Sequence, residues 1–388
     1  MKCIGNLFNM KKNKCCRVCG NDFFAEPILH YKNMPKSAQF LPDLAALSSE
    51  KGIDLEICEC MGCRLVQLNS EPVAYYKDVI RAAAFSEDME KFRIKQFSDF
   101  FKKYSLKGQK IIEIGCGKGE YLSIMQQCGA EAYGLEHLSE SVAQCINQGL
   151  KVEQGYIDNG SYTLKQAPFA AFFILNFFEH FPDPNSALKG IYNNLAPNAI
   201  GIVEVPNFDM ILRNKLFSEF IPDHIFYFTK KTLTTTLHLN GFDIIDCSEI
   251  WHDFIISATV KKGRRMDLSS FYQHQTKIKD EMDRYISQFK QKSVAVWGAS
   301  HQALAIISLA DLSNKIRYVV DSAPFKQGKY TSATHIPIVA PVMLNIDPVD
   351  AIIIMAASYS DEVARIVRQK FDKNINVSIL RDFGLEIV

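Results

Sequence analysis

Apolar runs of strand length alternate with helical patterns through the middle of the chain. The runs predict strands near residues 110–114, 131–136, 150–154, 170–175 and 199–205, with helices between them. This alternation is typical of a doubly wound parallel sheet, so we expect an α/β fold. A further pair of apolar runs, near 242–248 and 254–260, predicts two antiparallel strands that close the sheet.

Two amphipathic segments of this region are predicted to be helices. Apolar residues recur at helical spacing over 85–104, which predicts a helix that joins the N-terminal region to the sheet. We interpret its aromatic residues as core. Thr229 is expected to cap a helix over 230–240, because its side chain can accept a hydrogen bond from the first turn.

A second α/β unit is predicted beyond a long polar helix at about 267–290. An apolar run at 293–297 enters a turn at Gly298, a second run ends in Asp321, and a third covers 351–355. This order is typical of half of a Rossmann-type fold. Because the turn has a single glycine, we interpret the unit as a Rossmann-like scaffold or a wall beside the substrate rather than as a second cofactor site.

The composition bounds the number of domains and the class of partner. A chain of 388 residues, 47% of them hydrophobic, is expected to form two or three domains. Its formal net charge of +1 indicates neither nucleic acid nor an anionic membrane as a partner. No apolar run approaches the roughly 18–20 residues of a membrane helix, and the first residues lack the features of a secretory signal. We therefore expect a cytoplasmic protein with reduced thiols.

Seven of the eleven cysteines lie in the first 63 residues. Four of them form two Cys-x2-Cys arms: Cys16, Cys19, Cys60 and Cys63. Four thiolates can make the closed tetrahedral site that Zn²⁺ prefers, which indicates a structural metal. Two disulfides are the alternative, but a reducing compartment disfavours them. Cys15 and Cys58 lie beside the arms, so spacing alone does not determine the ligands, and we favour the four that adjoin the glycine-bearing pattern.

A glycine-rich turn follows the predicted strand at 110–114. Gly115, Gly117 and Gly119 alternate with other residues, and Glu113 lies just before them. Alternate glycines permit positive φ and let a ligand approach the main chain, while the N–H groups that open the next helix face that ligand. The turn therefore predicts a binding site for a cofactor.

Glu136 ends the next predicted strand, about 20 residues after the turn. An acid at this place can accept hydrogen bonds from both ribose hydroxyls of a nucleoside. A solvated charge at a strand end is the alternative. The glycine turn before it favours a nucleoside cofactor.

Two histidines are predicted to lie beside this cofactor. The fourth strand runs into Asn176, Glu179 and His180, and ligands of open α/β sheets bind at the carboxyl ends of strands. A buried structural role is the alternative for His180. Asp223 and His224 precede the predicted helix among aromatic residues, where a carboxylate could orient an imidazole or raise its pKa. This setting suits a general base.

The glycine turn resembles motif I of class I S-adenosylmethionine-dependent methyltransferases. Its spacing is Glu-x-Gly-x-Gly-x-Gly, whereas NAD enzymes use Gly-x-Gly-x-x-Gly. The resemblance implies S-adenosylmethionine as the methyl donor and S-adenosylhomocysteine as the product. It implies these cofactor-binding residues: Glu113, Gly115, Gly117, Gly119, Glu136 and Asn176.

The chain as a whole is similar to the sugar C-methyltransferases of deoxysugar biosynthesis. Besides motif I, the similarity is carried by Cys16-Arg-Val-Cys19-Gly, Cys60-x-x-Cys63-x-Leu65-Val66-Gln67-Leu68, His180-Phe-Pro-Asp-Pro, Asp223-His224, Val319-Val320-Asp321 and Lys326-Gln327-Gly328-Lys329-Tyr330. It covers nearly the whole chain. It implies a zinc-binding module at 1–80, a class I methyltransferase domain at 81–262 and a Rossmann-like C-terminal domain at 263–388.

In that family the substrate is a nucleotide-linked 4-keto-6-deoxyhexose. The resemblance implies that a base removes the proton at C3 and that the enolate takes the methyl group from the cofactor's sulfonium. His224, assisted by Asp223, would be the base. His180 would stabilise or relay charge at the C4 oxygen.

The chain departs from the family in two segments. Ile221 occupies a position at which the family usually has tyrosine, and Val79-Ile80-Arg81 replaces a Tyr-x-Tyr segment, with Tyr75 and Tyr76 slightly earlier. Transfer to oxygen or nitrogen of a sugar or natural-product intermediate is therefore an alternative. A non-catalytic, zinc-scaffolded binding protein is a second alternative, which the complete glycine motif disfavours.

Overall fold

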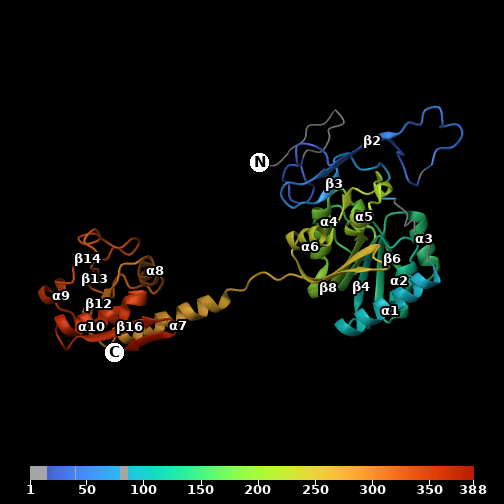
Figure 1. Ribbon diagram of the computed structural model, residues 1–388. Coiled ribbons are helices and arrows are strands. Elements are labelled where there is room, and N and C mark those ends of the chain that lie inside the picture. Colours follow the sequence, from blue (N-terminus) through green and yellow to red (C-terminus); the bar gives the residue numbers. More distant parts are fainter. Residues whose placement is uncertain (1–14, 40, 79–85) are drawn as a thin grey trace. The chain divides into compact units, whose positions relative to one another are not determined.

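The computed structural model of the chain describes residues 15–39, 41–78 and 86–388 (Figure 1). It divides into two compact units after Arg264, close to the boundary expected after residue 262. The boundary expected after residue 80, like the Val79-Ile80-Arg81 segment, falls outside the described residues. Within these described ranges, no helix is both long enough and apolar enough to cross a membrane.

A seven-stranded sheet forms the centre of the first unit, in the order β10-β11-β8-β7-β4-β5-β6. Its strands are β4 (Lys110–Ile114), β5 (Glu131–Glu136), β6 (Lys151–Gln154), β7 (Phe169–Leu175), β8 (Leu195–Pro206), β10 (Phe242–Ile250) and β11 (Ile255–Lys262). The strands from β8 to β6 are parallel, and β10 and β11 are antiparallel at one edge. The predicted doubly wound α/β fold, with its closing antiparallel pair, is confirmed.

Helices cover both faces of this sheet. The α-helices that the structure describes in this unit are α1 (Glu87–Tyr104), α2 (Glu120–Gln127), α3 (Ser139–Asn147), α4 (Pro184–Asn193), α5 (Phe208–Asn214) and α6 (Lys230–Leu239). Apolar residues of α1, α2 and α3 pack on one face, and those of α4 and α6 pack on the other. As predicted, Thr229 caps α6, and its side chain accepts the Thr232 N–H at 3.1 Å.

A four-stranded sheet joins the N-terminal region to this core. Its order is β1-β2-β3-β9, with β1 (Leu29–Met34), β2 (Ile53–Glu59), β3 (Val66–Leu68) and β9 (Phe226–Tyr227). β9 follows His224 closely, so the sheet combines segments that are far apart in the sequence. Cys16, Val18 and Leu65 lie in the same hydrophobic core as residues of α4 and α6. The N-terminal region and the seven-stranded sheet therefore share one core.

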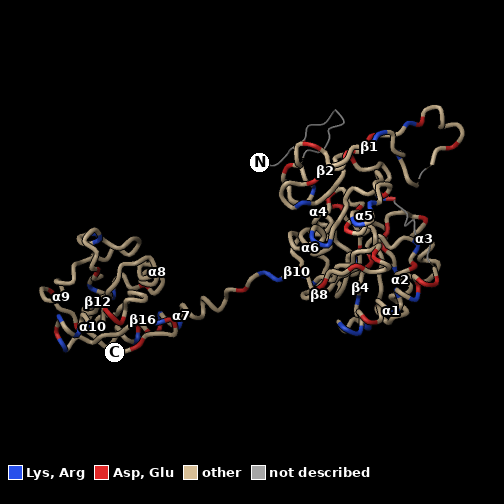
Figure 2. The backbone as a smooth tube through the Cα atoms, in the orientation of Figure 1, with Lys and Arg blue, Asp and Glu red and all other residues tan. Residues whose placement is uncertain are grey.

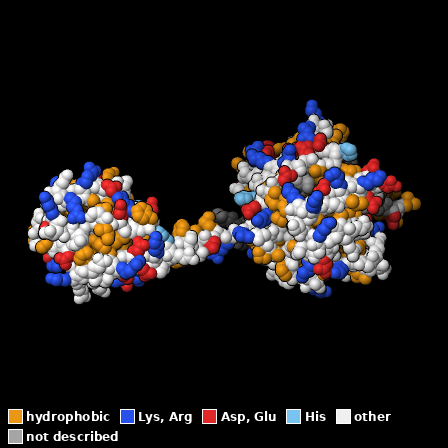
Figure 3. All heavy atoms as spheres, turned by 90° about the horizontal axis from the view of Figure 1, so that it is seen from below, with side chains coloured by type: hydrophobic (Ala, Val, Ile, Leu, Met, Phe, Trp, Pro, Cys, Tyr) orange, Lys and Arg blue, Asp and Glu red, His pale blue; other side chains and the backbone are white. Residues whose placement is uncertain are grey.

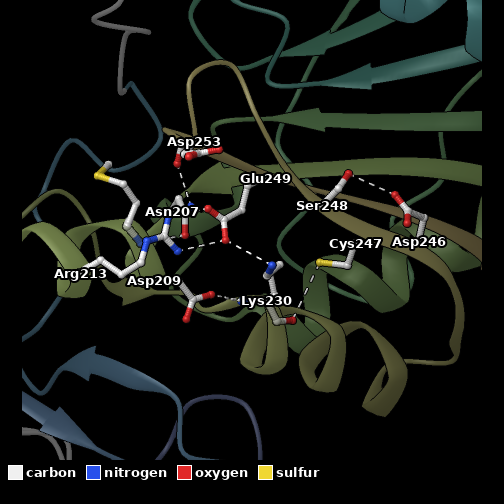
Figure 4. Close-up of polar contacts among 10 residues, drawn as sticks. Asn207, Asp209, Arg213, Lys230, Asp246, Cys247, Ser248, Glu249 and Asp253 are labelled. Carbon is white, nitrogen blue, oxygen red and sulfur yellow. Dashed lines mark hydrogen bonds and ion pairs between the residues drawn. The ribbon is translucent and has the colours of Figure 1, made fainter.

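A cluster of salt bridges connects the segment between β8 and α6 to the antiparallel edge of the sheet (Figure 4). Arg213 of α5 donates two hydrogen bonds to Glu249 of β10, at 3.1 and 2.6 Å, and Lys230 Nζ lies 3.2 Å from the same carboxylate. The hydrogen bonds from Arg213 are the main cause that lowers the pKa of Glu249 to about 2. Asp209 accepts the Lys230 N–H at 2.9 Å. The cluster thus fixes both ends of the segment between β8 and α6, and this segment carries His224.

A buried ion pair lies between α1 and β8. The Arg93 guanidinium and the Glu204 carboxylate are both fully buried, with Nη1 and Oε2 2.5 Å apart. Gln96 and Ser257 also donate to Glu204, at 2.7 and 3.1 Å, and Arg93 lies over the Tyr121 ring. A buried charge is tolerated only when it is paired, so each partner requires the other.

The second unit has its own six-stranded sheet, in the order β14-β13-β12-β15-β16-β17. Its elements are α7 (Ser269–Ile286), β12 (Val294–Trp297), α8 (His301–Leu309), β13 (Val319–Val320), β14 (Ile338–Val339), α9 (Met343–Ile346), β15 (Ala351–Ile354), α10 (Ser360–Lys370), β16 (Asn376–Arg381) and β17 (Gly384–Ile387). Its strands pair in parallel, except β16 with β17. Gly298 has a φ of 125°, and Asp321 accepts the Ala299 N–H at 2.8 Å and binds Lys326 Nζ at 2.9 Å. The Asp321 carboxylate of this Rossmann-like unit thus binds groups of the protein itself.

Charges of both signs are mixed over each unit. Figure 2 shows Lys and Arg interspersed with Asp and Glu along the backbone. On the face that Figure 3 presents, blue and red side chains are likewise mixed, with hydrophobic ones scattered among them. This distribution agrees with the small net charge of the chain.

The Arg93→Ala variant should lower the free energy of unfolding of the first unit by about 3–5 kcal/mol, because Glu204 would remain buried without its cation. Lys95→Ala is the matched control on the same helix, since Lys95 and its ion pair are exposed to solvent. Urea unfolding followed by Trp251 fluorescence, with Trp297 replaced by Phe, measures both. An equal decrease in the free energy of unfolding of the two variants would show that burial of the Arg93–Glu204 pair does not matter.

Candidate active site

The glycine turn lies between β4 and α2, and its three glycines serve different purposes. Gly115, Gly117 and Gly119 have φ values of 71°, 55° and 86°. A Cβ at Gly115 would lie 2.5 Å from the Phe177 ring, and one at Gly119 would lie 2.4 Å from Leu150, so these two glycines permit close packing. A Cβ at Gly117 would meet none of the described atoms within 4 Å. Gly117 is therefore the point at which a ligand has room to approach the main chain.

Glu136 connects the end of β5 to this turn. One carboxylate oxygen accepts the Gly117 N–H at 2.9 Å, and the other accepts the Leu138 N–H at 2.8 Å. The side chain is nearly buried, yet each oxygen has a second lone pair for a further hydrogen bond. This position suits the predicted contact with ribose hydroxyls.

Asn176 lies at the carboxyl end of β7. Its φ of 52° is in the left-handed region, and its backbone N–H donates to Glu204 O at 2.9 Å. Its side-chain Oδ1 is buried and has no hydrogen-bond partner among the described residues. Since a buried polar atom normally has a partner, this oxygen fits a contact with a bound cofactor. Glu113 is fully buried within the neighbouring strand β4.

Aromatic side chains narrow the space beside Glu136. A cavity of about 10 Å³, roughly the space of one water, is lined by Gly115, Glu136, Tyr156 and Phe177 among others. The Tyr156 and Phe177 rings meet edge to face with their centroids 6.4 Å apart. Neither residue was identified from the sequence, because both resemble ordinary core positions.

Two histidines and a glutamate meet near the carboxyl end of β7. Glu179 and His180 belong to a short 3₁₀ helix after β7, and His224 precedes β9. Glu179 Oε1 lies 3.7 Å from His180 Nε2 and 4.0 Å from His224 Nε2, and the two imidazole centroids are 4.9 Å apart. The Ile225 N–H donates to Glu179 O at 3.0 Å, which joins the two segments.

Both imidazoles are neutral near pH 7. Burial lowers the pKa of His180 to about 4, although the hydrogen bond to the Asp223 carbonyl acts in the opposite direction. Burial, and then the neighbouring His180, lower the pKa of His224 to about 3. His180 Nδ1 lies 2.7 Å from Asp223 O, so Nδ1 carries the proton and Nε2 keeps its lone pair. The His224 side chain is 23% exposed and therefore accessible to a ligand.

The ligand atoms of Glu179, His180 and His224 all lie within 4.8 Å of one another, which raises the question of a metal site. Two ligands of one tetrahedral zinc ion are only about 3.4 Å apart, because each bond to nitrogen or oxygen is about 2.1 Å long. Both glutamate–histidine separations exceed this value. The cluster fits proton transfer better than a preformed metal centre.

Asp223 does not act on His224 as expected from the sequence. Its carboxylate accepts a 2.5 Å hydrogen bond from Tyr75, which comes from the N-terminal region. Burial and His180 lower the pKa of His224, whereas an adjacent carboxylate would raise it, so the expected rise is wrong. Adjacent residues of a turn direct their side chains differently, and the carboxylate that faces His224 is Glu179.

Four thiols from the two Cys-x2-Cys arms converge in the N-terminal region. The Sγ atoms of Cys16 and Cys63 are 3.6 Å apart, and those of Cys19 and Cys60 are 3.4 Å apart. All four sulfurs lie within 4.8 Å of one another. This spacing is compatible with tetrahedral zinc, whose bonds to sulfur are about 2.3 Å long.

The other two candidate cysteines lie outside this group. Cys15 Sγ is 3.7 Å from Asp22 Oδ1, and Cys58 lies in β2 opposite Gln67 of β3. Spacing in the sequence left six candidates, and the geometry brings four of them together.

Two family descriptions match the chain. Residues 85–246 match a methyltransferase domain, and residues 260–378 match a C-methyltransferase C-terminal domain. C-methyltransferase NovU from Streptomyces niveus is 22% identical over 382 residues, which cover 90% of this chain and 90% of that protein. Together these matches show that the chain is an S-adenosylmethionine-dependent methyltransferase related to a C-methyltransferase.

Other relatives of this methyltransferase cover shorter parts of it. Ubiquinone biosynthesis O-methyltransferase from Bordetella avium is 29% identical over 90 residues, which cover 22% of this chain and 37% of that protein. A solved S-adenosylmethionine-dependent methyltransferase from Clostridium acetobutylicum is 13% identical, with a TM-score of 0.38, and covers 49% of this chain and 96% of that one. The family assignment therefore rests on the matches over the greater part of the sequence.

The Glu136→Gln variant of the methyltransferase should bind S-adenosylmethionine about 10- to 100-fold more weakly. A neutral amide would replace a charged acceptor, and a hydrogen bond to a charged group contributes about 1.5–3 kcal/mol. Glu131→Gln, at the opposite end of β5, is the control. Calorimetric titration measures both, and unchanged affinity in Glu136→Gln would refute the ribose contact.

Methyltransferase purified without chelator should contain about one zinc per chain, because four thiolates close one tetrahedral site. Cys16→Ser should lose the metal, whereas Cys15→Ser should retain it, since Cys15 lies outside the group. Inductively coupled plasma mass spectrometry measures the content. Zinc retained in Cys16→Ser, or absent from the native protein, would be evidence against the site.

Proposed function

We propose that this methyltransferase transfers a methyl group to the carbon next to the ketone of a nucleotide-linked 4-keto-6-deoxysugar. The observation that carries the proposal is the pair of neutral imidazoles beside Glu179, at the end of the sheet where ligands bind. The relative NovU, described as a C-methyltransferase, supports transfer to carbon. The motif resemblance to sugar C-methyltransferases supports the substrate class.

His224 is the proposed base. Its imidazole is neutral and accessible, and its Nε2 faces the Glu179 carboxylate at 4.0 Å. When His224 removes the proton at C3, it becomes an imidazolium and leaves an enolate on the sugar. The Glu179 carboxylate favours that imidazolium, as the aspartate does in a catalytic triad. Glu179 thereby takes the assisting role that the sequence suggested for Asp223.

Tyr75 is the proposed hydrogen-bond donor to the C4 oxygen. In the tautomer that the Asp223 carbonyl imposes, His180 Nε2 has no proton to donate, so His180 can only relay one. Burial and then Asp223 raise the pKa of Tyr75, which keeps its hydroxyl protonated. The hydroxyl now donates its single proton to Asp223, the residue next to His224, and would turn to the C4 oxygen when the sugar binds.

The remaining residues of the site orient the reactants and exclude water. The sulfonium of bound S-adenosylmethionine supplies a methyl group that is already activated. The chain therefore has to align the carbon nucleophile with that methyl group in a dry site. The buried Tyr156 ring and the partly buried Phe177 ring limit the access of water on the cofactor side.

The enzyme should catalyse exchange of the proton at C3 before any methyl transfer. Incubated in D₂O with thymidine-diphosphate 4-keto-6-deoxysugars and no methyl donor, it should incorporate deuterium next to the ketone, as mass spectrometry would detect. His224→Gln should slow this exchange by about 100-fold or more, since general-base catalysis typically contributes that much. Its affinity for S-adenosylmethionine should not change.

His238→Gln is the matched control, because His238 is exposed on α6. Exchange retained in His224→Gln would remove His224 as the base. Methyl transfer without exchange would favour oxygen or nitrogen as the acceptor. If neither exchange nor transfer occurs, the substrate class is wrong.

A further inference from the structure

The first cysteine arm (residues 16–19) contacts the segment that carries His180. Arg17 lies within this arm and donates from Nη1 to Pro182 O at 3.2 Å and from Nη2 to Ser70 O at 3.0 Å. Burial lowers the pKa of the Arg17 guanidinium, and the negative charges of Glu71 and then Asp183 act in the opposite direction. Pro182 follows His180 closely, so Arg17 holds the backbone that leads out of the candidate site.

The start of α4 also donates hydrogen bonds to the backbone of the first cysteine arm. Asn185, in the first turn of α4, donates from Nδ2 to Val18 O at 2.7 Å and to Arg17 O at 3.4 Å. Its Oδ1 accepts from Asn240 Nδ2 at 2.9 Å. The first cysteine arm and the start of α4 are therefore bound to each other by side chains from both.

A second connection runs from the first cysteine arm to His224. Gln67 of β3 is fully buried; its Oε1 accepts the Arg17 N–H at 3.1 Å, and its Nε2 donates to Cys16 Sγ at 3.2 Å. β3 pairs with β9, and the Leu68 N–H donates at 2.9 Å to the carbonyl of the residue that follows His224. The arm is thus connected to both candidate catalytic histidines.

We infer that the first cysteine arm positions these two histidines, with Arg17 as the positioning residue for His180. The inference rests on the proposed function for the roles of the histidines, but the contacts that carry it do not depend on the substrate. Ligation of Cys16 and Cys19 would fix the backbone from which Arg17 reaches Pro182. Without Arg17, His180 is free to shift relative to His224, and a displacement of about 1 Å can cost about 100-fold in rate.

Arg17→Met tests the inference, and Arg64→Met is its matched control. Arg64 directly follows Cys63, the last cysteine of the second arm, but its side chain is 54% exposed and pairs with Glu59. Arg17→Met should lower kcat about 10- to 100-fold, with the zinc content and the KM for S-adenosylmethionine unchanged. Arg17→Lys should restore part of kcat, because one ammonium can reach one of the two carbonyls. Arg64→Met should behave as the native protein.

A spectroscopic measurement gives a result without turnover. The Nδ1–H of His180, hydrogen-bonded to Asp223 O, should give a downfield proton resonance that disappears in His180→Gln. In Arg17→Met this proton should exchange with water at least about tenfold faster, whereas in Arg64→Met it should not change. Removing the metal from native protein with a chelator should accelerate the exchange in the same way.

The outcomes separate this inference from the proposed function. If the sugar class is wrong, the native protein does not turn the sugar over, while the His180 resonance still reports on Arg17. An unchanged resonance in folded, zinc-containing Arg17→Met would overturn the inference, and so would equal effects in Arg64→Met. If Arg17→Met does not fold, Asn185→Ser provides the same two measurements, because it removes the bonds to Val18 and Arg17 from the other side.

Discussion

The pairing of β3 with β9 is the contact on which the candidate active site depends. Only Val66 with Tyr227 and Gln67 with Phe226 are in register, and so short a ladder is marginal alone. The core beneath it stabilises the pairing, since apolar residues of β2, β3, α5 and β9 pack together there. The second cysteine arm closes the turn between β2 and β3, so the thiol cluster holds the hairpin to which β9 adds. The N-terminal region thereby fixes where His224 lies.

The site consists of two halves that depend on different kinds of contact. The cofactor half is made by the ends of β4, β5 and β7, which neighbour one another because the sheet is doubly wound. The acid–base half joins Tyr75, Glu179 and His224, which come from three separate segments. A change in the N-terminal region should therefore disturb proton transfer before it disturbs cofactor binding.

This division explains how much could be predicted from the sequence. Strands and helices follow from local periods, and these predictions are confirmed by the structure. The spacing placed Glu136 at the end of the strand after the glycine turn, and its hydrogen bond with the Gly117 N–H became visible only in the structure. The bonds from Tyr75 to Asp223 and from Arg17 to Pro182 leave no such pattern, because they join distant segments. Adjacency in the sequence was misleading for Asp223, since in a turn it does not imply contact between side chains. In the second unit, Asp321 was predicted at the end of a strand. Its hydrogen bond with the Ala299 N–H, in the turn after β12, was visible only in the structure.

The lowered pKa values of the two imidazoles restrict the chemistry that this site can support. The same burial that lowers their pKa values disfavours any isolated charge there. Removal of a substrate proton by His224 creates an imidazolium and an enolate side by side, and opposite charges in contact are stabilised in a medium of low dielectric constant. Glu179 Oε1 lies 4.0 Å from His224 Nε2 and can accept a hydrogen bond from the imidazolium. Methyl transfer then removes the charge of the enolate together with that of the sulfonium. Exclusion of water therefore strengthens the attraction between the imidazolium and the enolate. The same exclusion makes His224 a weak base in the free enzyme.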